Sequence, residues 1–387
     1  MTMQLIRNSR ASANLDMLRG LAAAAVFANH ARSLFFVDFA EVLDEGPITR
    51  GLYFATTLGH QAVVVFFVLS GFLIGSSVAR NLDHWSWKDY AVDRLTRLYI
   101  VLLPALVATA GWDAAGLALG NTAIYDGNAG GEIIRFAVRD RLDGHHFLVS
   151  AACCQTILAP AFGSNSPLWS LANEFWYYVL FPLGVLILRP STAVLPKLVY
   201  AALAVAISWF VGQSILMLFP VWLAGAAIRW APAARRTYAL RVAVIGVGFV
   251  VAGLCAATAL KQIPANVADY ALGGTVALWV YLMAHDNRPS NDTRLSRCYA
   301  RFARELAGVS YTLYLVHIPA LIFLRSLLLV DARWQPDGYA CVRMTVIALG
   351  LIGYVWLFAK FTERNTDRVR VWLKQRFGST NIRSVAS

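Results

Sequence analysis

Ten long apolar runs constrain the fold of this 387-residue sequence more than any other feature. A helix needs about 20 apolar residues to cross the hydrocarbon core of a bilayer, where only helices and closed barrels satisfy their own backbone hydrogen bonds. The runs reach or approach that length. We therefore expect an all-α, polytopic membrane helix bundle with spans at residues 17–37, 58–78, 98–118, 169–188, 193–212, 213–230, 242–260, 266–284, 308–330 and 341–361.

The composition agrees with a membrane protein. Charged residues make up 14% of the chain, against about 25% in soluble domains. The formal net charge is +12, but Lys and Arg gather in short loops between the apolar runs, as they do on the cytoplasmic side of membrane proteins. We therefore expect the lipid bilayer as a partner and no nucleic acid. The five cysteines show no C-x-x-C spacing, so we also expect no metal site.

The basic residues also orient the chain. With ten spans and the N-terminus inside, 23 of the 34 Lys and Arg residues lie on the inner side and 8 on the outer side. A further crossing at residues 145–158 would put the Arg-rich loops that follow it outside, so we interpret 145–158 as an interfacial or re-entrant helix. Both termini are then expected in the cytoplasm, with a transmembrane domain at residues 1–365 and a basic cytoplasmic tail at residues 366–387.

The first span carries two polar side chains at membrane depth, Arg19 and His30. They are 11 residues apart, close to three helical turns, so they share one face and are separated by about 16 Å along the helix axis. Asp16 lies one turn before Arg19 and is expected to pair with it. Ionisable side chains inside a membrane are costly and persist where they face a protein interior or a wet cavity. We therefore expect a polar track into the membrane, although Arg19 alone would also suit contact with lipid headgroups.

Two further groups of charged residues lie near the expected membrane edges. Arg94 and Arg97 are three residues apart at the inner end of the third span, a spacing with which two guanidinium groups can hold one phosphate. Glu174 lies among aromatic residues at the outer start of the fourth span. Simpler interpretations are available: the arginines as topology anchors, and Glu174 as the ion-pair partner of an arginine on a neighbouring helix.

The ninth span begins with a polar stripe. Ser310, Tyr314 and His317 fall at positions i, i+4 and i+7, which places them on one helical face. By itself, His317 is equally compatible with a core histidine bonded to a backbone carbonyl. Alongside His30, it becomes a second candidate for acid–base chemistry inside the membrane.

Five segments, in order along residues 14–365, resemble the acyltransferase family 3 of membrane O-acyltransferases. The segments are residues 15–20 with His30, 66–75, 94–99, 168–171 with Glu174, and 310–317. Two positions depart from the family pattern: Ile100 stands where a proline usually follows the arginine segment, and Glu363-Arg364-Asn365 replaces a common Glu-x-Pro ending. The resemblance identifies the chain as a stand-alone member without the family's optional esterase-like domain.

The resemblance implies a function as well. An acetyl or other short acyl group would pass from cytoplasmic acyl-CoA to a hydroxyl of a carbohydrate acceptor, such as lipopolysaccharide or exopolysaccharide, in a bacterial inner membrane. Acyl-CoA would be the donor substrate, with no permanently bound cofactor. The implied roles are His30 as general base or acyl carrier, Arg19, Glu174 and His317 as further catalytic residues, Arg94 and Arg97 as donor ligands, and Asp16, Ser70 and Tyr314 in support.

Two other classes of protein are compatible with parts of the sequence. A proton-coupled transporter explains a polar track of ionisable groups through the membrane, but it gives no reason for the paired arginines or for the five segments. A membrane scaffold with incidental polar residues explains least. The sequence therefore favours an acyltransferase.

Overall fold

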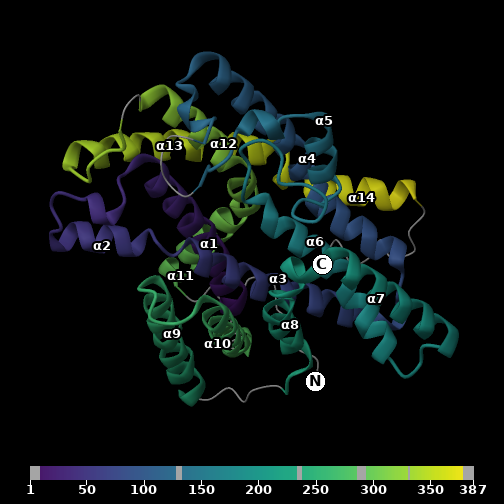
Figure 1. The fold of residues 1–387 in the computed structure, drawn as a ribbon. Helices are drawn as coiled ribbons and strands as arrows, with labels where there is room; N and C mark the ends of the chain where they lie inside the picture. Colours follow the sequence, from purple (N-terminus) through teal and green to yellow (C-terminus); the bar gives the residue numbers. More distant parts are fainter. Residues whose placement is uncertain (1–8, 128–132, 233–237, 286–292, 330–331, 378–387) are drawn as a thin grey trace.

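The protein is described by a computed structural model that covers residues 9–127, 133–232, 238–285, 293–329 and 332–377 (Figure 1). Across these residues the chain forms α-helices joined by loops and short 3-10 turns, which confirms the expected all-α fold. The helices are α1 (Arg10–Phe35), α2 (Pro47–Ala55), α3 (Gly59–Asn81), α4 (Trp87–Leu119), α5 (Gly144–Ala151), α6 (Leu168–Leu188), α7 (Val194–Leu216), α8 (Phe219–Ala227), α9 (Tyr238–Ala259), α10 (Ala265–His285), α11 (Arg294–Ala307), α12 (Ser310–Leu328), α13 (Gly338–Phe361) and α14 (Thr366–Arg376).

Within the described residues, eight helical stretches are long and apolar enough to cross a membrane. They include α3, α4, α6, α7, α9, α10, α12 and α13, and so confirm a polytopic membrane bundle. The first expected span, residues 17–37, falls in the 26-residue helix α1, which is long enough but carries several charged residues. The sixth expected span, residues 213–230, has a different structure from the one expected.

Residues 213–230 do not form one continuous helix. Gly212 has φ +70° and ψ −175°, a conformation that interrupts α7 and that glycine adopts readily. The nine-residue helix α8 follows, and then the 3-10 turn Ile228–Trp230. The break at Gly212 falls at the boundary between the expected spans 193–212 and 213–230, whereas the end of α7 at Leu216 and the closing 3-10 turn were not expected.

Helix α8 packs very closely against α3. A Cβ atom at Gly71 would lie 2.0 Å from the carbonyl oxygen of Trp222, and one at Gly75 would lie 2.7 Å from that of Ala226. Only glycine permits such an approach of two helix backbones, as small residues do in membrane helix packing. The contacts advance in the same direction along both helices, so α3 and α8 run parallel.

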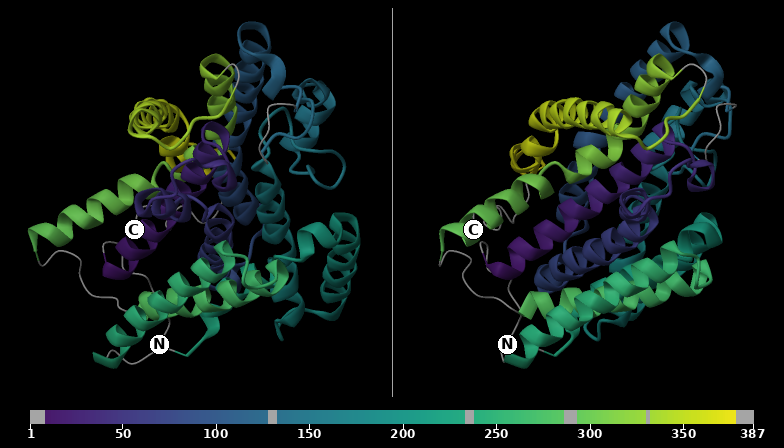
Figure 2. Two further views of the ribbon diagram at one scale, coloured as in Figure 1. Left: turned by 60° about the vertical axis from the view of Figure 1, so that its left-hand side comes forward. Right: turned by 90° about the vertical axis from the view of Figure 1, so that its left-hand side faces the viewer.

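Helix α12 packs against α1, α4 and α13, and α1 in turn packs against α3, α10 and α11. In Figure 2, α1, α3, α9 and α10 run alongside one another. Because α1 and α12 are neighbours over much of their length, the polar residues that the sequence places on each helix can meet inside the bundle.

The helix expected at 145–158 is shorter than predicted. Helix α5 ends at Ala151, and the chain then turns, with φ values of +54° at Cys153 and +69° at Thr156. Positive φ values are incompatible with continuing a right-handed helix. The prediction of a helix over all of 145–158 was therefore wrong in its second half.

A buried loop follows these turns and enters the helical bundle. Ser164 and Asn165 are both 0% exposed. Ser164 donates from its backbone nitrogen and its hydroxyl to the buried carboxylate of Asp113 on α4, at 2.8 and 2.7 Å. Burying a carboxylate is costly unless it is hydrogen-bonded, and these two bonds anchor the loop to α4.

The expected tail at 366–387 begins as helix α14, which packs on α4. Asp93 of α4 contacts Lys374 Nζ at 2.7 Å and Arg370 Nε at 3.5 Å. Residues 378–387 lie outside the described residues, and the domain division at residue 365 stays a prediction.

Candidate functional site

His30 of α1 and His317 of α12 form a hydrogen-bonded pair inside the bundle. His30 Nδ1 lies 2.8 Å from His317 Nε2, and the two rings stack with centroids 5.1 Å apart and an interplanar angle of 13°. His317 is 0% exposed, whereas His30 is half-buried. Residues 287 apart in the sequence are therefore in direct contact.

The hydrogen bonds assign a tautomer to each ring. His317 Nδ1 lies 2.8 Å from the carbonyl oxygen of Leu313, which can only accept, so His317 carries its proton on Nδ1. Its Nε2 is then an acceptor, and His30 must donate to it from Nδ1. The lone pair of His30 therefore resides on Nε2, and within the described part of the chain no hydrogen bond uses that atom.

The loop anchored by Asp113 supports α12 beside His317. Pro319 has no N–H, so the carbonyl of Leu315 lacks its helical donor. Asn165 Nδ2 supplies a donor to that carbonyl at 2.8 Å and also donates to Thr109 Oγ1 at 3.0 Å. A side chain from the loop thus replaces the backbone hydrogen bond that Pro319, two residues beyond His317, removes from α12.

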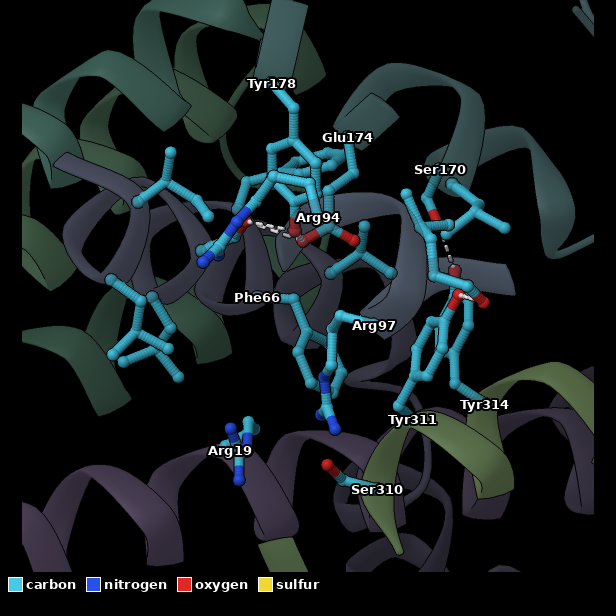
Figure 3. Close-up of a pocket in the computed structure, with 18 residues that line it drawn as sticks. Arg19, Phe66, Arg94, Arg97, Ser170, Glu174, Tyr178, Ser310, Tyr311 and Tyr314 are labelled. Carbon is cyan, nitrogen blue, oxygen red and sulfur yellow. Dashed lines mark hydrogen bonds between the residues drawn. The ribbon is translucent and has the colours of Figure 1, made fainter. Parts of the chain in front are cut away.

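A cavity of about 160 Å³ lies between α1, α3, α4, α6 and α12, and neither His30 nor His317 is among the residues that line it. Figure 3 shows Arg19 and Arg97 near Ser310 at one end of it, with Arg94, Glu174 and Tyr178 at the other. Most of the remaining lining is apolar. The predicted site residues on the cavity wall are Arg19, Ser70, Arg94, Arg97, Glu174 and Tyr314.

Arg19 and Arg94 keep part of their donor capacity free. Arg19 Nη2 contacts Asp16 Oδ1 at 3.5 Å, the pair expected from the sequence, and donates to the carbonyl oxygen of Ala307 at 3.3 Å. The guanidinium of Arg94 lies over the ring of Tyr90, 5.8 Å from its centroid. The buried Nε atoms of both arginines have no hydrogen-bond partner in the described structure. Both guanidinium groups belong to residues that line the cavity, and guanidinium groups are common ligands of anions.

Arg97 pairs with Glu363, a residue for which the sequence predicted no role in the site. Its Nη2 donates to Glu363 Oε1 at 2.9 Å, and its guanidinium lies over the ring of Tyr311, 5.6 Å from the centroid. Glu363, at the end of α13, is 5% exposed. The only sequence signal was the Glu363-Arg364-Asn365 ending, because the two charged residues are 266 positions apart.

Glu174 belongs to the cavity and not to the histidine pair. Its Oε1 accepts from Ser70 Oγ at 2.6 Å and from Tyr178 OH at 2.5 Å, and Trp222 Nε1 donates to the same serine oxygen at 3.2 Å. Among the described residues, no hydrogen bond joins Glu174 to either histidine. The structure thus brings His30 and His317 together but places Glu174 in a separate polar group.

Tyr314 lies between the cavity and the histidine pair. It lines the cavity, and its hydroxyl is 2.6 Å from Ser170 Oγ. Its ring centroid is 6.3 Å from that of His317 and 5.9 Å from that of Phe66. Tyr314 is therefore the cavity residue that contacts the ring of His317.

Asp143, His145 and His146 also lie together, with one ligand atom from each within 4.8 Å of the others. They are near the N-terminus of α5, where Asp143 Oδ1 accepts from the backbone nitrogen of His146 at 2.8 Å. Helix capping accounts for this arrangement. The expectation of no metal site stays a prediction.

Comparison with known proteins identifies the family of the chain. The acyltransferase 3 profile (Acyl_transf_3, described as an acyltransferase domain) matches residues 12–362. Acyltransferase MdmB from Streptomyces mycarofaciens is 35% identical over 179 residues, which are 46% of this chain and 40% of that protein. The chain therefore aligns with less than half the length of this curated relative. No solved structure matches the chain significantly. The profile match covers most of the sequence, and the chain is therefore a multi-pass membrane protein that belongs to the acyltransferase 3 family.

Proposed function

We propose that the protein transfers an acetyl or other short acyl group from cytoplasmic acyl-CoA to a hydroxyl of a carbohydrate acceptor. The observation that carries this proposal is the His30–His317 hydrogen bond, which leaves a lone pair on His30 Nε2, in the same helix bundle as a cavity lined by Arg19, Arg94 and Arg97. An acyl transfer of this kind needs an anion-binding end for the donor and a base at the reacting carbonyl. The site offers both within one bundle.

The cavity supports acyl-CoA as the donor. The phosphate groups of acyl-CoA suit the guanidinium groups of Arg19, Arg94 and Arg97 on the cavity wall. A planar guanidinium can bind a phosphate through two hydrogen bonds at once. The apolar middle of the cavity suits the long arm of the donor. Arg19 and His30 lie about 16 Å apart along α1, so an extended arm held at the arginines would bring its thioester towards His30.

The histidine pair supports two forms of the reaction. As a general base, His30 Nε2 takes the proton of the acceptor hydroxyl while the oxygen attacks the thioester carbonyl; the C–S bond then breaks and the thiolate is reprotonated from the imidazolium. As an acyl carrier, His30 Nε2 attacks the carbonyl itself and the C–S bond breaks to release the CoA thiolate; the acceptor hydroxyl then attacks the acyl group, the C–N bond to His30 breaks, and the hydroxyl proton passes to the thiolate. In both forms, His317 keeps the Nε2 lone pair of His30 directed at the substrate.

The remaining predicted residues have proposed roles at the cavity. The Glu174 group, with Ser70 and Tyr178, is placed to contact the donor instead of orienting His30. Tyr314 is placed to close on the acyl group between cavity and histidines. We further propose a bacterial inner-membrane location with both termini in the cytoplasm, on the basis of the Lys and Arg distribution.

A direct test uses the purified protein in liposomes. Acetyl-CoA labelled in the acetyl group is supplied on the side of the Arg-rich loops, and a panel of polysaccharides, lipopolysaccharides and small glycosylated compounds on the other. We expect label to appear as an alkali-labile ester on one acceptor. If no acceptor is labelled and the donor is neither consumed nor bound, an acyl-CoA-dependent transferase is excluded.

A further inference from the structure

The carboxylate of Glu363 joins three helices next to the cavity. Oε1 accepts from Arg97 of α4 at 2.9 Å. Oε2 accepts from the backbone nitrogen of Thr312 at 3.0 Å and from its hydroxyl at 2.9 Å. Since Glu363 follows the last turn of α13, this one buried side chain ties the end of α13 to the cavity-facing part of α4 and to the start of α12.

The contact with Thr312 satisfies the start of α12. Thr312 lies in the first turn of that helix, where backbone N–H groups have no partner within the helix. Val309, the residue at the cap position, makes no side-chain cap hydrogen bond. A carboxylate is favourable at this positive end of the helix dipole, so Glu363 supplies from α13 the cap that the local sequence lacks.

The contact with Arg97 fixes the orientation of a guanidinium on the cavity wall. Arginine has five N–H donors in a rigid plane, and holding one of them at Glu363 Oε1 leaves others for a ligand. The ring of Tyr311 lies along the guanidinium and limits its rotation further. Without Glu363, Arg97 would lose both its orientation and its neutralising partner.

We propose that Glu363 is a positioning residue that presents Arg97 to the phosphate groups of the donor while it anchors α12, the helix that carries His317. This inference rests on the proposed use of acyl-CoA. Loss of the Glu363 carboxylate should mainly weaken donor binding, through Arg97. It should slow the chemical step at the histidines to a smaller extent.

The test is the variant Glu363→Gln, studied as purified full-length protein in liposomes. We expect the KM for acetyl-CoA to rise about tenfold or more, the size expected for losing one charge-assisted hydrogen bond, with a smaller change in kcat. Glu305→Gln is the matched control, because Glu305 pairs with the neighbouring Arg364 at 2.7 Å but its side chain is 64% exposed. We expect its KM to equal that of the wild type.

A double variant separates positioning from general loosening. If Glu363 acts through Arg97, then Glu363→Gln should change the donor KM little in an Arg97→Ala background, because coupled residues are non-additive. An unchanged KM in Glu363→Gln, or an equal further loss in the Arg97→Ala background, overturns the proposal. If Glu363→Gln does not fold, Glu363→Asp takes its place, since it keeps the charge but shortens the reach, and the same outcomes apply. A wild-type protein that neither binds nor uses acyl-CoA would instead refute the proposed function.

Discussion

Replacing His317 with phenylalanine tests whether this residue sets the tautomer of His30. The change keeps an aromatic ring in a fully buried position but removes the acceptor that lies 2.8 Å from His30 Nδ1. A buried donor left unpaired costs about 1–3 kcal/mol, which corresponds to roughly 5- to 150-fold in rate. We therefore expect kcat to fall about 10- to 100-fold, with little change in the KM for the donor, because the arginines are untouched.

The assay is acyl transfer by purified protein in lipid at saturating donor and acceptor. His317→Gln serves as the comparison, because its amide oxygen can still accept from His30 Nδ1 and should restore part of the rate. A wild-type kcat in His317→Phe would refute the orienting role of His317. A loss as large as that of a His30 variant, not relieved in His317→Gln, would mean that His317 itself reacts.

Three further predictions address the donor site, the packing and the topology. Replacing Arg94 and Arg97 together by alanine should weaken acyl-CoA use without preventing membrane insertion. Replacing both by lysine should restore acyl-CoA use only in part, because an ammonium group lacks the planar, bidentate geometry of a guanidinium. An unchanged affinity for the donor would mean that both residues serve only to orient the chain in the membrane. Gly71→Ala should lower the melting temperature of the protein in detergent, since overpacking typically costs about 1–3 kcal/mol. Gly111→Ala is the control and should leave the melting temperature unchanged, because no atom lies within 4 Å of a Cβ at that position. Equal melting temperatures for the two variants would contradict the α3–α8 contact. Reporter fusions at Arg235-Arg236 and at the C-terminus should both report cytoplasmic locations, and an external C-terminus would overturn the ten-span interpretation.

The sequence predicted the membrane bundle well because span length and apolar composition are local properties. The polar faces of α1 and α12 were also predictable, since helical periodicity alone places Arg19 with His30 and Tyr314 with His317. The boundary at Gly212 was expected too, between the spans 193–212 and 213–230, but the division of residues 213–230 between the end of α7, α8 and a 3-10 turn was not, because residues 215–228 carry no charged side chain that would mark it.

Long-range pairings account for what the sequence could not provide. Glu363 and Arg97 are separated by 266 residues, and Asn165 reaches the Leu315 carbonyl across 150 residues. Glu174 was expected as a further catalytic residue or as the ion-pair partner of an arginine, and its hydrogen-bond partners are Ser70 and Tyr178. In each case the residue type indicated a polar role, but only the packing of distant helices decides which partner it meets.

The most direct test of the account is acyl transfer by His30→Gln in purified protein reconstituted in lipid. Glutamine keeps the polarity and approximate size of histidine but cannot exchange a proton near neutral pH, and a general base typically contributes about 10²–10⁴-fold. We expect normal insertion and donor binding with transfer reduced by at least that factor, and a complete loss if His30 carries the acyl group. Full activity in His30→Gln would contradict the central claim and would move the reacting base to another residue of the cavity, first of all Glu174.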